Sequence, residues 1–518
     1  MRRLTLRALI LAAILASEAL IASALLDGPD LRQRGGLITL FIRDYGVWLV
    51  RGLVGFAVLF TSFAFLKFRR ALELVSQRLE KDPIRWPLLL AHFGAVFAVA
   101  WMAAALWGGK TGLPQDLLAA GCIAGAFAAV ILAATAVVPL PSWIELLRET
   151  RPLPAWAFGA AVVACLGGML SLRLWGPATR VTFRMVQLIL HPLFPDLLVQ
   201  PEALRIGTSR FTVLITRDCS GLEGTALILV FALVWLFIMR NEIRFPQALA
   251  LVPAAVVLLF VLNSFRIAAL IVIGNAGARD IAMKGFHSQA GWMAFNLVAV
   301  GMSLTARRVH WFAAVPATDE FPAAPWLLPF AAILAAGMIS RAASGSFEWL
   351  YPLRFVAAAA VLWTFRHKYR ELDWSFGWTG VAAGVAVFVL WIGLDSSPSA
   401  AAPEQAQPWW IVLRVLAAVV TVPIAEELAF RGFLLRRLIA PDFEAVSFRT
   451  FTWSALIASS VLFGVLHGDR WMAGTAAGLA YAAASLRKGR IGEAVAAHAV
   501  TNGLLAAYVL VFQKWQFW

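Results

Sequence analysis

Three polar segments in the first part of the chain contain side chains that could carry out acyl transfer. Residues 217–224 read RDCSGLEG and place Cys219 directly before an apolar run, while Arg266 (in NSFRIAALI) and His287 (in FHSQAGWMAF) stand at the ends of the next two runs. A thiol is a weak nucleophile until a base or a positive field yields the thiolate. His287 could exchange that proton, and Arg266 could stabilise an oxyanion or bind a carboxylate. Singly, these residues also fit packing or interfacial roles; together they favour cysteine-based catalysis.

A second set of polar residues begins in residues 422–438, which read VPIAEELAFRGFLLRRL. Glu427 and Arg431 are four residues apart with the acid first, the favourable order for a helical ion pair, so Glu426 is left for chemistry. Three later residues could complete a site: His467, His498 and Asn502.

This second set allows three interpretations. A carboxylate and two histidines can activate a water directly, with the Asn502 amide stabilising the oxyanion. Alternatively, Glu426, His467 and His498 hold a divalent metal that lowers the pKa of the water. The third interpretation is a buried polar network that ties helices together. For the whole set we favour a site.

The composition requires a lipid environment for the elements that carry these residues. The 518 residues are 61% hydrophobic and 14% charged, with a mean hydropathy of +0.79. Apolar runs of about 17–25 residues, each long enough to cross a bilayer, recur along the whole chain. We predict an all-α polytopic transmembrane bundle of about 15 spans, the first of which is a retained N-terminal anchor.

The net charge of +15 does not indicate nucleic acid as a partner. The basic residues of the chain lie in short loops between apolar runs, where they set the orientation of the spans in the membrane. No soluble basic domain is present to bind nucleic acid. With the N-terminus in the cytoplasm, alternation of spans puts Cys219, Arg266 and His287 at one depth on the outer face. The same alternation puts His467 near the outer end of its span and Glu426 and His498 nearer the cytoplasm, which is a conflict within the second set.

Two Pro/Ala-containing linkers divide the chain. They are residues 310–326 and 394–410. We predict a first transmembrane domain at 1–308, a linker with additional helices at 309–404 and a second membrane domain at 405–518. That division suggests two membrane domains fused in one chain.

The first set of motifs resembles the exosortases, membrane-embedded cysteine transpeptidases of Gram-negative bacteria. The resemblance covers roughly residues 1–306 and implies that Cys219 is the nucleophile, His287 the acid/base and Arg266 the third essential residue, with Arg217 in support. It implies no cofactor for the cysteine site. The implied clients are exported proteins with a C-terminal sorting signal, which consists of a PEP-like motif, a transmembrane helix and a basic tail. The implied location is the bacterial inner membrane, with this site near the periplasmic face.

The second set resembles the CAAX protease and bacteriocin-processing (CPBP) family of intramembrane proteases. Its EExxxR, FxxxH and HxxxN pattern is matched over about residues 405–510, with Phe463 four residues before His467. The resemblance implies that Glu426 activates water, that His467 and His498 complete the site, and that Glu427 with Arg431 supports it. An exosortase-like half joined to a CPBP-like half resembles the exosortase E/protease type, which is associated with VPEID-CTERM signals.

The sequence therefore predicts a bifunctional membrane enzyme, a cysteine transpeptidase fused to an intramembrane endopeptidase. One alternative is a polytopic transporter or lipid-handling protein whose intramembrane polar residues line a pathway. Another is a catalytically silent scaffold for envelope assembly. The polar residues form two compact sets instead of a stripe through many spans, which favours the enzyme.

Overall fold

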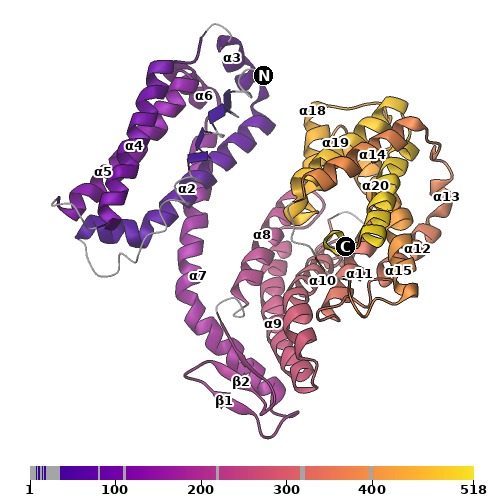
Figure 1. The fold of residues 1–518 in the computed structure, drawn as a ribbon. Helices are drawn as coiled ribbons and strands as arrows, with labels where there is room; N and C mark the ends of the chain where they lie inside the picture. Colours follow the sequence, from indigo (N-terminus) through magenta and orange to yellow (C-terminus); the bar gives the residue numbers. More distant parts are fainter. Residues whose placement is uncertain are drawn as a thin grey trace. The chain divides into compact units, whose positions relative to one another are not determined.

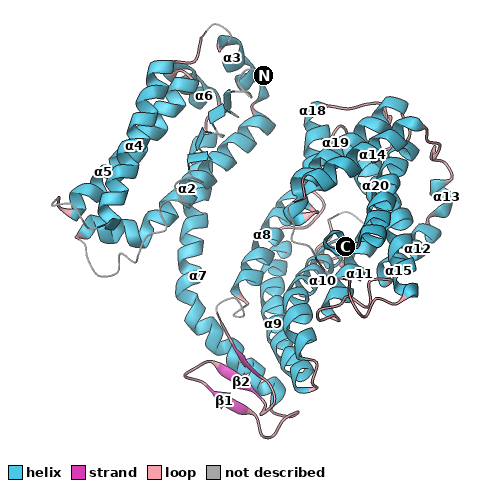
Figure 2. Ribbon diagram, in the orientation of Figure 1, coloured by secondary structure: helices cyan, strands magenta, loops and turns pink. Residues whose placement is uncertain are grey.

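A computed structural model describes most of the chain, and helices dominate it (Figures 1 and 2). The described residues are 7–8, 10–11, 14–15, 17–18, 36–79, 82–108, 113–216, 221–314, 321–395, 400 and 402–518. Within them, the strands are confined to one small sheet. The predicted all-α membrane fold is confirmed. An isolated helix satisfies its own backbone hydrogen bonds, which a bilayer core without water requires.

Helices of two lengths carry the apolar runs. In the described residues, six helices are long and apolar enough to cross a membrane, and five shorter apolar helices of 10–17 residues accompany them. The predicted number of about 15 spans stays a prediction. The six long spans are Trp86–Leu106, Gln115–Val137, Leu153–Leu170, Gln247–Asn275, Ala324–Ala342 and Ile491–Phe512.

The chain divides into two compact units, Met1–Leu174 and Trp175–Trp518. In the first unit α4 and α5 pack along each other, and small residues of α5 permit the close approach. A β-carbon added to Gly121 would lie 2.5 Å from the sulfur of Met102, and one added to Gly125 would lie 2.6 Å from Val99. The elements of this unit are α2 (Leu37–Lys67), α3 (Arg69–Arg78), α4 (Trp86–Gly108), α5 (Gln115–Val137), α6 (Leu140–Glu149) and the first part of α7 (Leu153–Leu190).

The long helix α7 differs from the expected span, which ended near residue 175. It continues without a break to Leu190, although Pro177 lies inside it. Arg180 and Arg184 lower the hydropathy of this extension, so a search for apolar runs misses it. The extension is amphipathic, and its apolar side, including Val186, is buried against β2 and α9.

The second unit begins with this extension, a small antiparallel sheet and three helices. The sheet has the order β1-β2-β3, with Val199 opposite Ile206 and Ile206 opposite Val213. Helices α8, α9 and α10 lie side by side around a shared apolar core (Figure 1). The elements are β1 (Leu198–Gln200), β2 (Arg205–Gly207), β3 (Thr212–Leu214), α8 (Leu222–Ile238), η3 (Gln247–Ala250), α9 (Leu251–Asn275), the π-helix η4 (Ile281–Phe286) and α10 (His287–Arg308).

The C-terminal part of the second unit is a bundle whose central helix contains two π-helical segments. Residues 408–437 form one helical stretch in which α16, carrying Glu426 and Glu427, is flanked by the π-helices η5 and η6. The elements of this part are α11 (Ala324–Ala342), α12 (Leu353–Thr364), α13 (Arg366–Tyr369), α14 (Trp378–Gly393), α15 (Pro408–Leu416), η5 (Ala417–Thr421), α16 (Val422–Glu427), η6 (Leu428–Leu434), α17 (Leu435–Arg437), α18 (Trp453–Val465), η7 (Gly468–Arg470), α19 (Trp471–Lys488), α20 (Ile491–Phe512) and η8 (Trp515–Phe517).

Small residues bring α14 and α20 close together. A β-carbon on Gly384 would lie 2.4 Å from the carbonyl oxygen of Ala497, and one on Gly380 would lie 2.7 Å from the carbonyl oxygen of Glu493. The Thr501 hydroxyl also donates to the Gly384 carbonyl at 2.9 Å. Because Ala497 precedes His498, this contact sets the position of a candidate site residue.

Candidate active sites

The first candidate site brings together Arg266 from α9 and His287 from the start of α10. One guanidinium nitrogen, Nη2, donates to the His287 carbonyl oxygen at 2.8 Å and lies 3.4 Å from the ring nitrogen Nδ1. The other, Nη1, donates to the Asn263 side-chain oxygen at 3.1 Å. The structure thus places these two residues in direct contact, a closer relation than the shared depth that hydropathy indicates.

Asn263 connects this pair to the segment RDCSGLEG. Gly221 has a φ of 82°, and a β-carbon there would lie 2.8 Å from the Asn263 side-chain nitrogen. A glycine suits both the left-handed conformation and the close approach. Gly221 follows Cys219 by two residues in the sequence, whereas Arg217 and Cys219 themselves lie outside the described residues.

A π-helix, η4, leads directly into His287. Its backbone packs closely on the chain after α11: a β-carbon on Gly285 would lie 2.0 Å from the Ser344 carbonyl oxygen. The π-helical turn is rare and is found frequently at functional sites. Here it shifts the helical register immediately before His287. The direction of the His287 side chain therefore depends on the π-helix, which the hydrophobic periodicity of the sequence does not reveal.

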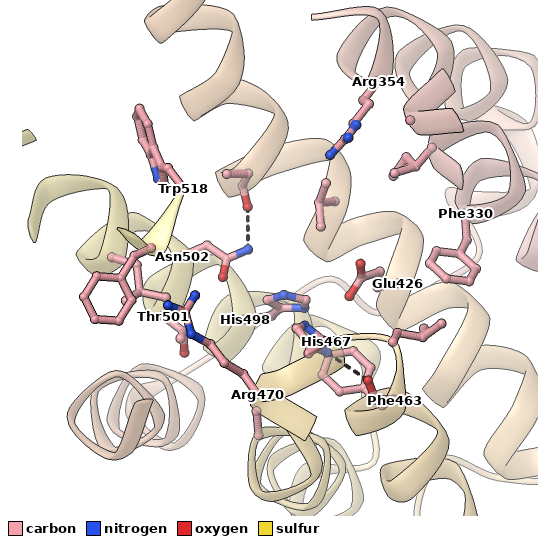
Figure 3. A pocket seen from close by; sticks show the side chains of 18 of the residues that line it. Phe330, Arg354, Glu426, Phe463, His467, Arg470, His498, Thr501, Asn502 and Trp518 are labelled. Carbon is pink, nitrogen blue, oxygen red and sulfur yellow. Dashed lines mark hydrogen bonds between the residues drawn. The ribbon is translucent and has the colours of Figure 1, made fainter. Parts of the chain in front are cut away.

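The second candidate site is a cavity of about 370 Å³ inside the C-terminal bundle. Four residues of the predicted set line it, and they come from α16, the turn after α18, and α20: Glu426, His467, His498 and Asn502. Figure 3 shows the Glu426 carboxylate beside the rings of His498 and His467. Oε2 of Glu426 is buried and has no hydrogen-bond partner among the described residues.

Glu427 is held in place by two partners. Its Oε1 accepts from Arg431 Nη1 at 3.2 Å and from His498 Nδ1 at 3.0 Å, and Arg431 Nε lies 3.1 Å from Oε2. The Glu427 and Arg431 side chains are 0% and 4% exposed. Arg431 is anchored further by the Gly478 carbonyl at 2.6 Å. The expected ion pair is present, and Glu427 also orients His498, a contact that the sequence motifs do not show.

Hydrogen bonds also orient the two other polar residues of the cavity. Nδ1 of His467 lies 2.9 Å from the Phe463 carbonyl oxygen, which can only accept, so Nδ1 carries the proton and Nε2 presents a lone pair in the neutral ring. Asn502 donates one amide proton to the Ala418 carbonyl at 2.8 Å, and an amide has a second proton to offer.

The conflict over membrane depth is resolved by the length of α18. This helix has 13 residues, which corresponds to about 20 Å, whereas the hydrocarbon core of a bilayer is about 30 Å thick. It is therefore too short to cross the core as a complete span. Its end, with His467 two residues beyond, lies beside Glu426 and His498, and the conflict does not arise if α18 is not counted as a complete span.

The same residues test the metal interpretation. Within the described part of the chain, no three His, Cys, Asp or Glu side chains form a group that could hold a metal ion. Nδ1 of His498 is committed to Glu427, and Nδ1 of His467 to a backbone carbonyl. Both contacts use Nδ1 and leave Nε2 of each ring unassigned, so the metal interpretation stays a prediction, and we derive no step through a metal.

Aromatic rings around the histidines were not identified from the sequence. Tyr481 stacks on His498 with ring centroids 4.9 Å apart, and Trp391 meets His467 edge-on at 5.3 Å. Arginines also line the cavity, and Arg414 stands inside an otherwise apolar run. An arginine within an apolar run is a signal that could have identified it, because such a residue is costly to insert.

Comparison with known families covers both candidate sites. Residues 52–304 match the family model for transmembrane exosortases of the EpsH type. Residues 408–504 match the model described as Type II CAAX prenyl endopeptidase Rce1-like. The chain thus joins a segment similar to transmembrane exosortases to a segment similar to Rce1-like endopeptidases. No curated protein and no solved structure matches it significantly.

The two matches confirm both predicted resemblances. Both families are peptidase-type enzymes, so this is a multi-pass membrane protein of the protease/transpeptidase kind. The exosortase match includes Cys219, Arg266 and His287, and the Rce1-like match includes Glu426, His467, His498 and Asn502. Helices α11, α12, α13 and α14 lie between the two matches.

Proposed function

We propose that the protein is a bifunctional enzyme of the bacterial inner membrane, with a cysteine transpeptidase and a glutamate-dependent endopeptidase in one chain. The observation that carries the first activity is the direct contact of Arg266 with His287, linked through Asn263 to the chain two residues after Cys219. The observation in support of the second is a cavity lined by Glu426, whose buried Oε2 has no hydrogen-bond partner among the described residues.

In the transpeptidase, the Cys219 thiolate attacks the scissile carbonyl carbon and forms a tetrahedral intermediate. The positive charge of Arg266 stabilises the oxyanion, which is the role for which a permanent charge suits arginine. His287 takes the thiol proton and returns it to the amine that leaves when the C–N bond breaks. The client is then held as a thioester until an acceptor nucleophile attacks it and releases Cys219.

In the endopeptidase, Glu426 removes a proton from a water, and the resulting hydroxide attacks the scissile carbonyl. Glu427 and Arg431 hold His498, and the His467 ring is fixed by its bond to the backbone. The two histidines position the water, and the proton that Glu426 took from it passes to the leaving amine as the C–N bond breaks. The second amide proton of Asn502 stabilises the oxyanion.

For the first site we propose exported proteins with a C-terminal sorting signal of the PEP or VPEID-CTERM type as clients. The resemblance to the exosortase E/protease type supports this class, and a transmembrane helix in the signal suits an enzyme that is itself embedded in the bilayer. The cysteine site would then face the periplasm, and the bilayer would be its environment, with nucleic acid playing no part.

The test is co-expression of the full chain with a client that ends in such a motif, a helix and a basic tail. Mass spectrometry identifies the bonds cut by the unmodified chain and by the Cys219→Ala and Glu426→Ala variants. We expect loss of the cut at the motif in Cys219→Ala and its retention in Glu426→Ala. A motif cut that needs Glu426 alone would reverse the two roles. Substrate flux that survives Cys219→Ser, with no cut in any chain, would favour the transporter.

A further inference from the structure

Arginines from three helices outside the predicted catalytic set line the same cavity as Glu426. They are Arg341 in the last turn of α11, Arg354 in the first turn of α12, and Arg414 in α15. Arg354 interacts electrostatically with both of the others. Two of these helices, α11 and α12, precede the Rce1-like match, so the group is built partly by the segment that joins the two families.

A single carboxylate of the described part of the chain, Glu348, interacts with all three arginines of this group, so it balances one of their three charges. Glu348 pairs with Arg354 at 2.5 Å. Among the described residues, Arg341 and Arg414 have no hydrogen-bonding or ion-pair partner. Nε of Arg354 is buried and also lacks an acceptor within the described residues. Arg354 and Arg414 are half-buried and Arg341 is exposed, and guanidinium groups that gather beside one another in a cavity favour a compensating anion.

Rigid contacts hold the group in position. The Arg414 guanidinium lies 4.0 Å from the ring centroid of Tyr351, and the Arg354 guanidinium lies 4.3 Å from the same ring. Trp410 and Trp518 flank Arg414 at 5.1 and 5.0 Å. These cation–π contacts order the side chains without using their hydrogen-bond donors. Figure 3 shows the Arg354 guanidinium turned toward the cavity in which the Glu426 carboxylate lies.

From this geometry we infer that Arg341, Arg354 and Arg414 form a binding site for a carboxylate of the peptide cleaved at Glu426. The inference rests on the proposed endopeptidase. Arginine forks bind carboxylates through paired hydrogen bonds. A phospholipid headgroup would offer similar oxygens, but its two acyl chains would follow it into the cavity where the scissile bond must lie. A peptide brings the carboxylate and the scissile bond on one extended chain.

The helix that carries both sites sets their spacing. Arg414 precedes Glu426 by 12 residues in one helical stretch. At about 1.5 Å per residue this is about 18 Å, which an extended peptide spans with about five residues. The backbone separation is an upper limit because both side chains reach into one cavity, so the carboxylate is expected within about five residues of the scissile bond, as an Asp or Glu side chain or as the free C-terminus.

The experiment measures binding of labelled peptides to the full chain carrying Glu426→Gln, in nanodiscs of phosphatidylcholine. Blocked dodecapeptides of Ala, Val and Leu carry one Asp at each position in turn, and each is paired with its Asn counterpart. A second pair compares a free C-terminus with a C-terminal amide. We expect one acidic form to bind about tenfold more tightly than its neutral partner, with the preference lost when Arg341→Gln or Arg414→Gln is added.

The control is Arg370→Gln, which removes the same charge from an exposed arginine that does not line the cavity. It is expected to keep the preference. No acidic preference, or a preference that persists in Arg341→Gln and Arg414→Gln, would overturn the proposal. If nanodiscs of phosphatidylglycerol abolish the preference, a lipid headgroup occupies the site instead.

Cleavage of the same peptides by the chain with Glu426 intact separates this inference from the proposed function. An acidic preference in binding without Glu426-dependent cleavage would remove the endopeptidase and leave the carboxylate site. Glu426-dependent cleavage with equal binding of the acidic peptide and its neutral partner would support the endopeptidase and remove the carboxylate site.

Discussion

At the residue scale, adjacent glutamates of α16 have opposite environments. Glu427 is fully buried and is bound by Arg431 and His498, whereas Glu426 lines the cavity with one oxygen unpartnered among the described residues. An ionised group kept without a partner inside a protein is costly, and such groups gather where chemistry needs them. The two carboxylates are therefore expected to respond differently to the same substitution.

Glu426→Gln is predicted to abolish endopeptidase activity by more than 100-fold with little change in stability. Glu427→Gln is predicted to lower the free energy of unfolding by about 3–5 kcal/mol, because it leaves Arg431 charged and buried without its partner. Denaturation of the two purified variants, together with a peptide-cleavage assay, provides the comparison. Equal destabilisation by both substitutions would contradict the division of roles.

Arg266 offers a second prediction at this scale. A lysine keeps the charge but cannot donate at once to the Asn263 side chain and the His287 carbonyl, which the arginine fork does. Arg266→Lys is predicted to slow formation of the client thioester by about 100-fold, the lower end of the range found when one transition-state contact is lost. The rate is measured by stopping the reaction at successive times and quantifying the client thioester in each sample. A Lys variant as fast as the unmodified chain would show that charge alone is needed.

At the scale of elements, the close packing of α14 on α20 is predicted to position His498. Gly384→Ala would force its β-carbon to within 2.4 Å of the Ala497 carbonyl oxygen, so one helix must move. We expect a loss of about 1–3 kcal/mol of stability and reduced endopeptidase activity. The matched control is Gly393→Ala in the same helix, where nothing lies within 4 Å.

A thermal melt and the two activities of each glycine variant provide the measurements. The cysteine-dependent cut is expected to survive in Gly384→Ala, because that substitution lies outside the exosortase match. If Gly393→Ala proves as harmful as Gly384→Ala, the effect does not come from the contact with Ala497; helix propensity alone would favour alanine at both positions.

At the scale of the whole molecule, the sequence was informative about residue types and poorly informative about helix geometry. Apolar runs predicted helices because transfer into lipid depends on average hydrophobicity, and the motif residues Glu426, His467 and His498 do line one cavity. Hydropathy carries no information on rotation about a helix axis or on contacts between helices. The pairing of His498 with Glu427 therefore depends on packing that no local pattern reports.

Two other features escaped prediction for related reasons. The extension of α7 to Leu190 is amphipathic, and its stability comes from burial against the sheet and α9 instead of from lipid. The π-helices η4, η5 and η6 change the register beside both candidate sites, and no composition signal marks them. In both cases tertiary contacts decide the local structure.

The central claim for the whole molecule is that Cys219 forms a covalent intermediate with a client. Intact-mass spectrometry of the full chain, isolated after co-expression with a client bearing a sorting motif, tests it most directly. The account predicts an adduct with the mass of the client up to the motif, attached at Cys219, released by hydroxylamine and absent in Cys219→Ala. A client cut at its motif with no such adduct, and cut equally well by Cys219→Ala, would contradict it.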